Sequence, residues 1–163
     1  MTSEGRFKLD HARLTDVPAL HTLINTFAAR DVLLPRGMNE LYENLRDYWV
    51  VRDGDKLVGC AALHLLWADL AEIRSVSVDE ALQKEGLGSA LVNACIEEAI
   101  KLAVPTVFVL TLRPNFFARL GFKQVELMSL PRKVFGECVR CPKFHRCDEI
   151  AMVQRLAPEE ESR

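Results

Sequence analysis

The sequence predicts an α+β fold with α/β/α layers, in which helices flank a mixed, mostly antiparallel sheet with a central parallel strand pair. Two observations support this fold class. Three short apolar segments separated by turn signals lie between residues 48 and 78, which is typical of an antiparallel meander. An apolar strand, a glycine turn, an amphipathic helix and a wholly apolar strand follow between residues 71 and 111, and this order is typical of a βαβ unit with parallel strands.

The first half of the chain predicts two helices and four strands. Thr15, Asp16 and an early-turn proline, Pro18, precede apolar residues at helical spacing, so we expect a helix over 19–29. A second, short helix is expected over 38–45. Asp53-Gly54 is a hairpin signal between two apolar segments. The expected strands are 7–13, 48–52, 56–66 and 70–78.

The second half predicts a long helix that packs on the sheet. Apolar residues form a broad face over 89–101, and the apolar segment 106–111 is typical of a central strand covered on both faces. A short helix over 115–120 is closed by Gly121, and strands are expected over 122–127 and 147–154. We therefore expect a single domain over 1–157, followed by a charged, frayed tail at 158–163.

Composition excludes several classes of partner. The formal charge of −2 and the pI near 6.1 give no basic face for nucleic acid, and no apolar run approaches the roughly 20 residues that cross a bilayer. Five cysteines, an odd number in a chain that can build its own core, indicate reduced thiols rather than a disulfide frame. We expect a cytoplasmic protein with small-molecule partners, without nucleic acid or membrane.

The segment 83–89, Gln83-Lys84-Glu85-Gly86-Leu87-Gly88-Ser89, lies between the expected strand 70–78 and the helix. Two glycines let the backbone approach a ligand, and the first-turn amides of a helix have no intrahelical acceptor. The helix dipole and the charge of Lys84 add to the attraction for an anion. The segment therefore predicts a phosphate-binding turn.

These residues carry a family resemblance. The strand 71–78, Gln83-x-x-Gly86-x-Gly88 and the later Leu120-Gly121-Phe122 resemble the acetyl-CoA-binding landmarks of the Gcn5-related N-acetyltransferases (GNAT). The resemblance implies acetyl-CoA as co-substrate, with its pantetheine held by the main chain of 73–78 where the two parallel strands splay apart. The implied cofactor-binding residues are Val76, Val78, Gln83, Lys84, Gly86, Leu87, Gly88 and Ser89.

A narrower likeness is to the short, stand-alone amino-acid N-acetyltransferases of the N-acetylglutamate synthase type. It rests on Leu34-Pro35-Arg36, the segments 58–64 and 71–75, Phe116-Phe117-x-x-Leu120, and Cys141-Pro142-Lys143-Phe144. It implies acetylation of the α-amine of a free amino acid, L-glutamate above all, on the route to arginine, and a homodimer is common in the family. The alternatives are acetylation of another small amine or of a protein N-terminus, and a non-catalytic domain that senses coenzyme A.

The reaction needs a group that removes a proton from the attacking amine. By its position in the strand, Glu72 resembles the general base of the family's histone-acetylating members. An ion pair with Arg74, two residues on and on the same face, is an equally weighted alternative. Phe116 and Phe117 stand where many members have a tyrosine that protonates the leaving thiolate, and a phenyl ring cannot do so; we assign no general acid.

The carboxylate of an amino acid calls for an arginine. Arg36 resembles the substrate-binding arginine of the family's Leu-Pro-Arg motif, and Arg146 is a second candidate; Arg74 and Lys133 are weaker ones. The alternative for each is a solvated surface charge. By resemblance, Leu34 and the main-chain amide of Cys60 also face the substrate.

Cys138-x-x-Cys141-x5-Cys147, with His145 between the last two, raises the question of a zinc site. One residue between His145 and Cys147 is too tight a spacing for the second half of such a site. We favour buried or redox-sensitive cysteines and expect no metal. The side chains of Cys60 and Cys95 are expected in the core.

Overall fold

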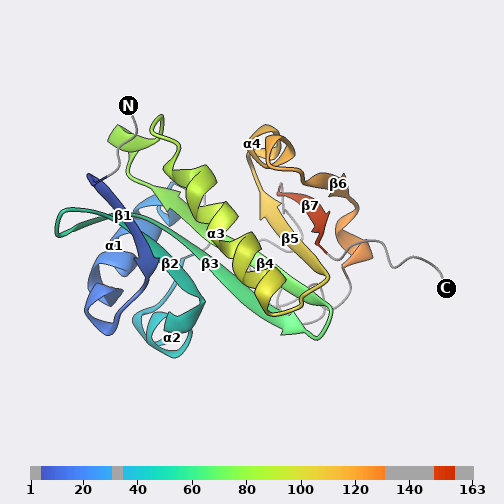
Figure 1. Ribbon diagram of the computed structural model, residues 1–163, viewed down its shortest axis with the longest axis horizontal. Coiled ribbons are helices and arrows are strands. Elements are labelled where there is room, and N and C mark those ends of the chain that lie inside the picture. The colour runs from blue at the N-terminus through green and yellow to red at the C-terminus, as the bar shows by residue number, and fades with distance from the viewer. Residues whose placement is uncertain (1–4, 31–34, 131–148, 157–163) are drawn as a thin grey trace. The chain divides into compact units, whose positions relative to one another are not determined.

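The computed structural model describes residues 5–30, 35–130 and 149–156 (Figure 1). Its strands hydrogen-bond in the order β1-β2-β3-β4-β5-β7-β6. The described chain divides into two compact units. Unit 1 comprises the described parts of Met1–Leu63 and Ile73–Glu98, and unit 2 those of His64–Glu72 and Ala99–Arg163. A single domain over 1–157 stays a prediction.

The elements follow the expected order. The helices are α1 (Val17–Ala28), α2 (Met38–Glu43), α3 (Leu87–Lys101) and α4 (Pro114–Arg119), with 3-10 turns η1 (Leu14–Asp16), η2 (Leu45–Asp47), η3 (Glu80–Leu82) and η4 (Leu127–Ser129). The strands are β1 (Phe7–His11), β2 (Tyr48–Asp53), β3 (Lys56–Trp67), β4 (Leu70–Val78), β5 (Thr106–Thr111), β6 (Lys123–Val125) and β7 (Ile150–Arg155). No helix in these described segments is long and apolar enough to cross a membrane.

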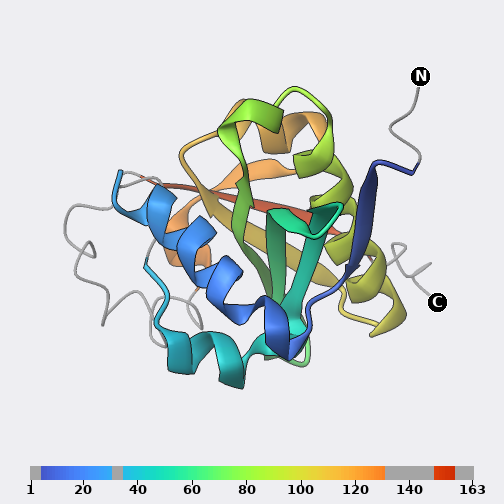
Figure 2. The ribbon, with the colours of Figure 1, turned by 90° about the vertical axis from the view of Figure 1, so that its left-hand side faces the viewer.

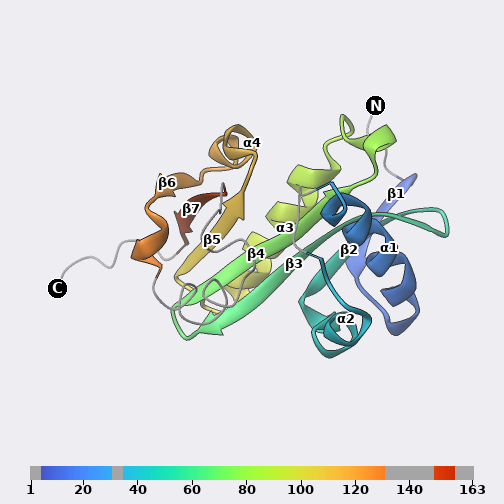
Figure 3. The same cartoon turned by 180° about the vertical axis from the view of Figure 1, so that it is seen from behind.

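In unit 1, α1 and α2 cover one face of the sheet (Figure 3). Strands β1 and β2 pair antiparallel, as do β2 and β3. Side chains alternate across a strand, so every second residue of β2 and β3 faces the two helices. The buried cluster on this face comprises Val17, Leu20, Ile24, Leu41, Tyr48, Val50, Cys60 and Ala62.

Helix α3 packs on the opposite face of the same strands. A methyl group on Gly59 of β3 would lie 3.1 Å from the Leu91 side chain, so glycine at this position lets α3 approach the strand closely. Trp49 of β2 donates its indole N–H to Glu98 of α3 at 3.0 Å. The expected helix, sheet and helix layers are therefore present in unit 1, and Figure 2 shows them edge-on.

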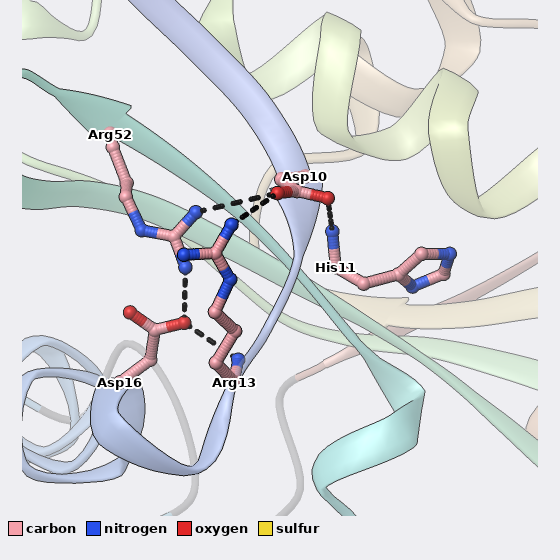
Figure 4. Close-up of polar contacts among 5 residues, drawn as sticks. All are labelled: Asp10, His11, Arg13, Asp16 and Arg52. Atoms are coloured by element: carbon pink, nitrogen blue, oxygen red, sulfur yellow. Dashed lines mark hydrogen bonds and ion pairs between the residues drawn. The ribbon is translucent and has the colours of Figure 1, made fainter.

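A polar network ties the start of α1 to β1 and β2 (Figure 4). Arg52 of β2, with 14% of its side chain exposed, binds the carboxylates of Asp16 and Asp10. Asp16 also accepts a hydrogen bond from the amide of Arg13 at 2.7 Å, and Arg13 pairs with Asp10 at 3.2 Å. One buried guanidinium thus joins three elements, which fixes the position of α1 on the sheet.

Unit 2 contains the expected parallel strand pair. Ala71 of β4 lies opposite Val107 of β5, and Glu72 lies opposite Phe108, in parallel register. Strand β7 pairs antiparallel with both β5 and β6 and so lies between them. The buried cluster of this unit is formed by Leu70, Phe108, Leu130 and Ala151.

Helix α4 ends as the Leu-Gly-Phe sequence predicts. Gly121 has φ +97°, and its amide bonds to the carbonyl of Ala118 at 3.1 Å. The amide of Phe122 returns to the carbonyl of Phe117 at 3.1 Å, and the two rings meet edge to face at 5.5 Å. This arrangement closes the helix and starts β6.

Several boundaries differ from the sequence prediction: β1 ends at His11 rather than at residue 13, α1 begins at Val17 rather than at residue 19, and α2 ends at Glu43 rather than at residue 45. Helix α3 begins at Leu87 rather than at residue 89, because the carbonyl of Gly86 already accepts the amide of Ala90 at 3.1 Å. Strand β6 ends at Val125, because the chain turns into η4. The described part of the last strand runs over Ile150–Arg155 rather than 147–154.

Candidate functional site

The turn before α3 has the backbone geometry of an anion site. Gly86 has φ +77°, a left-handed conformation that glycine adopts without strain, and a methyl group on it would meet no atom within 4 Å. Its carbonyl accepts the first hydrogen bond of α3. The amides of Leu87, Gly88 and Ser89 therefore fall in the first helical turn, where the helix offers them no acceptor. This turn can bind a phosphate group.

Side chains hold the turn against β4 and β3. The Gln83 amide donates to the carbonyl of Val78 at 3.2 Å, and the main-chain amide of Asp79 donates to the carbonyl of Val58 at 2.8 Å. The Asp79 carboxylate accepts the amide of Ala81 at 3.0 Å. Gln83 thus positions the turn, and its expected contact with the cofactor stays a prediction. Lys84 is exposed beside it.

Strand β4 carries the expected base and one expected arginine. Glu72 is 4% exposed and Arg74 9% exposed, so neither is a solvated surface charge. Further along the strand Val76 is half-buried and Val78 is buried. A base role for Glu72 and its alternative, an ion pair with Arg74, both stay predictions.

Between these residues β4 carries a backbone feature that the sequence did not reveal. Ser75 has φ +58°, the left-handed region that non-glycine residues seldom adopt, and it is 7% exposed. Its carbonyl accepts hydrogen bonds from the Cys60 thiol at 3.3 Å and the Ser77 hydroxyl at 3.2 Å. Its own hydroxyl lies 3.5 Å from the Tyr48 hydroxyl, which donates to it. Three side chains therefore hold one strained residue.

Tyr48 belongs to unit 1, as do the expected substrate residues Arg36, Cys60 and Arg74. Its side chain is buried, and this burial raises the pKa of the phenol, while the hydrogen bond with Ser75 and the guanidinium groups of Arg36 and Arg74 act in the opposite direction. Cys60 lies in the same buried cluster as Tyr48. A shared role of Arg36, Arg74 and Cys60 in binding the substrate stays a prediction.

Tyr48 and Ser75 are the members of this group that sequence reasoning missed. The available signal was a tyrosine at the start of an otherwise apolar strand, since buried tyrosine hydroxyls need a polar partner. For Ser75 there was no signal, because a left-handed residue within a strand has no pattern in the sequence.

Arg36 is held from two sides. Its main chain bonds the Asn25 side chain of α1 twice, with the Arg36 amide donating at 3.1 Å and the Asn25 amide donating to the Arg36 carbonyl at 2.9 Å. Its guanidinium, 12% exposed, pairs with Glu40 at 2.5 Å. The loop between α1 and α2 therefore presents this cation in a fixed place. Asn25 is a positioning residue that the sequence did not single out.

The cysteine side chains in the described segments are core residues, as expected. Cys60 and Cys95 are free and buried; burial raises the pKa of Cys60 to about 12 and also raises that of Cys95. Among the described residues no group of three or more His, Cys, Asp or Glu side chains could hold a metal ion. The remaining candidates, Leu34, Lys133, Cys138, Cys141, His145, Arg146 and Cys147, lie outside the described residues.

Comparison with known proteins places the chain in a family. Residues 18–122 match the model of the acetyltransferase (GNAT) family. An amino-acid acetyltransferase of Mycobacterium tuberculosis is 43% identical over 132 residues, which cover 79% of this chain and 75% of that protein. An uncharacterized N-acetyltransferase of Chlorobaculum tepidum is 37% identical over 146 residues, covering 90% of this chain and 94% of the relative.

Solved structures give the same fold. Rv2747 from Mycobacterium tuberculosis, solved in complex with CoA and NLQ, has a TM-score of 0.80 and 34% identity, over 92% of this chain and 99% of that one. N-acetylglutamate synthase from Neisseria gonorrhoeae, complexed with coenzyme A and N-acetyl-glutamate, has a TM-score of 0.80 and 25% identity. That match covers 93% of this chain and 35% of the synthase.

Proposed function

The chain belongs to the acetyltransferase (GNAT) family and is an N-acetyltransferase, and we propose that it acetylates the α-amine of a free amino acid, L-glutamate or a close analogue. The observation that carries the proposal is the pair of largely buried guanidinium groups of unit 1: Arg36, 12% exposed with its main chain held by Asn25, and Arg74, 9% exposed. Two fixed cations suit a small acceptor with carboxylates better than a simple amine. The relatives named amino-acid acetyltransferase support the same acceptor class.

The proposed co-substrate is acetyl-CoA, which supplies the acetyl thioester when bound. The amides of Leu87, Gly88 and Ser89 would bind its pyrophosphate, with Gly86 giving the close approach and Lys84 adding positive charge. Val76 and Val78, on the strand that leads into this turn, would contact it through their main chain. The coenzyme A complexes of both solved neighbours support this assignment.

Glu72 is the proposed proton acceptor. An α-ammonium group has no lone pair to attack a carbonyl carbon, so its proton must first pass to a base, directly or through one water. Attack by the neutral amine then forms the nitrogen–carbon bond and breaks the carbon–sulfur bond. The sulfur leaves as a thiolate and takes up the second proton that the nitrogen loses, directly or through water. Arg36 would hold the α-carboxylate during this step, since a bidentate guanidinium fixes both distance and orientation.

An assay of free thiol release tests the proposal. Acetyl-CoA is mixed with L-glutamate, L-glutamine, L-aspartate, L-lysine or the α-carboxamide of glutamate, and the thiol is followed with a chromogenic disulfide. We expect release with glutamate and the loss of nearly all of it with the α-carboxamide, which has the same shape without the charge. Release only with L-lysine would contradict the acceptor class, and acetyl-CoA binding without any release would contradict catalysis.

Arginine biosynthesis and a homodimer follow from the family likeness, and together with a cytoplasmic location they are part of this proposal. A role in arginine biosynthesis is tested by growth. Deletion of the gene should make growth depend on added arginine, and the Glu72→Gln variant should fail to restore growth without it.

A further inference from the structure

The left-handed Ser75 lies at the centre of β4, between two groups of proposed site residues. Glu72 and Arg74, the proposed base and a proposed substrate ligand, precede it on the strand. Val76 and Val78, proposed for the cofactor, follow it. A change of its φ from +58° to an extended value would turn the chain at Arg74 relative to the chain at Val76, and both residues belong to unit 1. The conformation of Ser75 therefore sets the relative direction of Arg74 and Val76.

Serine does not hold this conformation by its own preference, because a left-handed residue with a Cβ is strained. Three donors on three strands surround it: the Tyr48 hydroxyl of β2, the Cys60 thiol of β3 and the Ser77 hydroxyl of β4. Cys60 and Ser77 both bond the Ser75 carbonyl. These two bonds hold the peptide that follows the left-handed residue.

We propose that Cys60 and Ser77 are positioning residues for acetyl transfer, because their hydrogen bonds to the Ser75 carbonyl hold Ser75 in its left-handed conformation between Arg74, a proposed substrate ligand, and Val76, proposed for the cofactor. The inference rests on the proposed function. It assigns the Cys60 side chain a role that is neither nucleophilic nor redox: the thiol is completely buried and stays protonated, so it remains a donor. Tyr48 supports the same residue through its hydroxyl.

The test compares two buried cysteines. Cys60→Ala removes the thiol that bonds Ser75, and the matched control Cys95→Ala removes an equally buried thiol of α3. We expect Cys60→Ala to lower kcat about tenfold or more while KM for acetyl-CoA changes less than about twofold, because misalignment acts on the reacting geometry. Cys95→Ala should retain kcat. Cys60→Ser, which keeps a donor, should recover most of the loss.

A second substitution distinguishes loss of the Ser75 conformation from a nonspecific loss of folded structure. Glycine adopts a left-handed φ without strain, so Ser75→Gly added to Cys60→Ala should raise kcat about threefold or more above Cys60→Ala alone. The inference would be overturned by equal kcat in Cys60→Ala and Cys95→Ala. It would also be overturned if the effects of Cys60→Ala and Ser75→Gly on kcat were independent. In both cases turnover by the wild-type protein would leave the proposed function intact. A wild-type protein without turnover would overturn the proposed function itself.

Discussion

Substitution of Gly86 by alanine tests the phosphate turn most directly. Gly86 has φ +77° and open space around the position of a Cβ, so the added methyl meets no protein atom. Under the proposed function it would lie against the phosphate. Gly54, in the hairpin between β2 and β3, is a matched control. It has φ +61° and equally open surroundings, and it lies outside the proposed site.

Gly86→Ala and Gly54→Ala should lower stability alike, and only Gly86→Ala should lower the affinity for CoA. Alanine in a left-handed conformation costs about 1–2 kcal/mol at either position, which should lower Tm by roughly 2–8 °C in a chain of this size. Only Gly86→Ala displaces the phosphate. Loss of one hydrogen bond to a charged group, about 1.5–3 kcal/mol, should raise the Kd for CoA roughly 10- to 150-fold.

The assay is calorimetric titration with CoA, followed by kinetics with acetyl-CoA and with acetyl-pantetheine, which lacks the pyrophosphate. Gly86→Ala should raise KM for acetyl-CoA and leave KM for acetyl-pantetheine unchanged. Gly54→Ala should change neither. Equal CoA affinity in the Gly86→Ala and Gly54→Ala variants would refute the placement of the phosphate.

Four further substitutions test the site and its scaffold. Glu72→Gln should lower kcat about 100-fold or more and flatten the pH profile, because the proton acceptor is lost. Arg36→Lys should raise KM for the amino acid about tenfold with kcat little changed, because a lysine cannot bind a carboxylate bidentately. Arg52→Met should lower the free energy of unfolding by about 2 kcal/mol, since it leaves the buried Asp16 without its cation, and thermal unfolding measures this. The pKa of Asp10 is lowered, first by the hydrogen bond from the main-chain amide of the next residue. The Asp10 charge therefore stabilises the fold above the ordinary pKa of 3.8, and this contribution is lost as the pH falls through the folded value. Asp10→Asn should lower Tm at pH 7 and leave it nearly unchanged at pH 2.

Each of these predictions has a result that contradicts it. An unchanged pH profile of Glu72→Gln at saturating substrates would remove Glu72 as the base. A fall in kcat with constant KM in Arg36→Lys would argue against substrate binding by Arg36. An unchanged Tm for Arg52→Met would mean that the network in Figure 4 contributes no net stability, and equal Tm losses at pH 7 and pH 2 would contradict the role of the Asp10 charge.

The sequence by itself determined the order of elements and the turn. Helical spacing, the hairpin glycine Gly54 and the apolar segment that became β5 are local signals, so each element formed close to its expected place. The left-handed Gly86 is likewise a local requirement, because only glycine adopts that conformation without strain. The parallel pairing of β4 and β5 followed from the connection between them.

The tertiary structure decided what the sequence could not encode locally. The position of β7 between β5 and β6 depends on pairing between distant segments. The group around Tyr48 brings together β2, β3 and β4, whose separation along the chain hides their proximity. Ser75 is left-handed although it carries a Cβ, and Cys60 of β3 and Ser77 donate to its carbonyl. Such strain persists only where the surrounding structure holds it, so it depends on the neighbouring strand being in place.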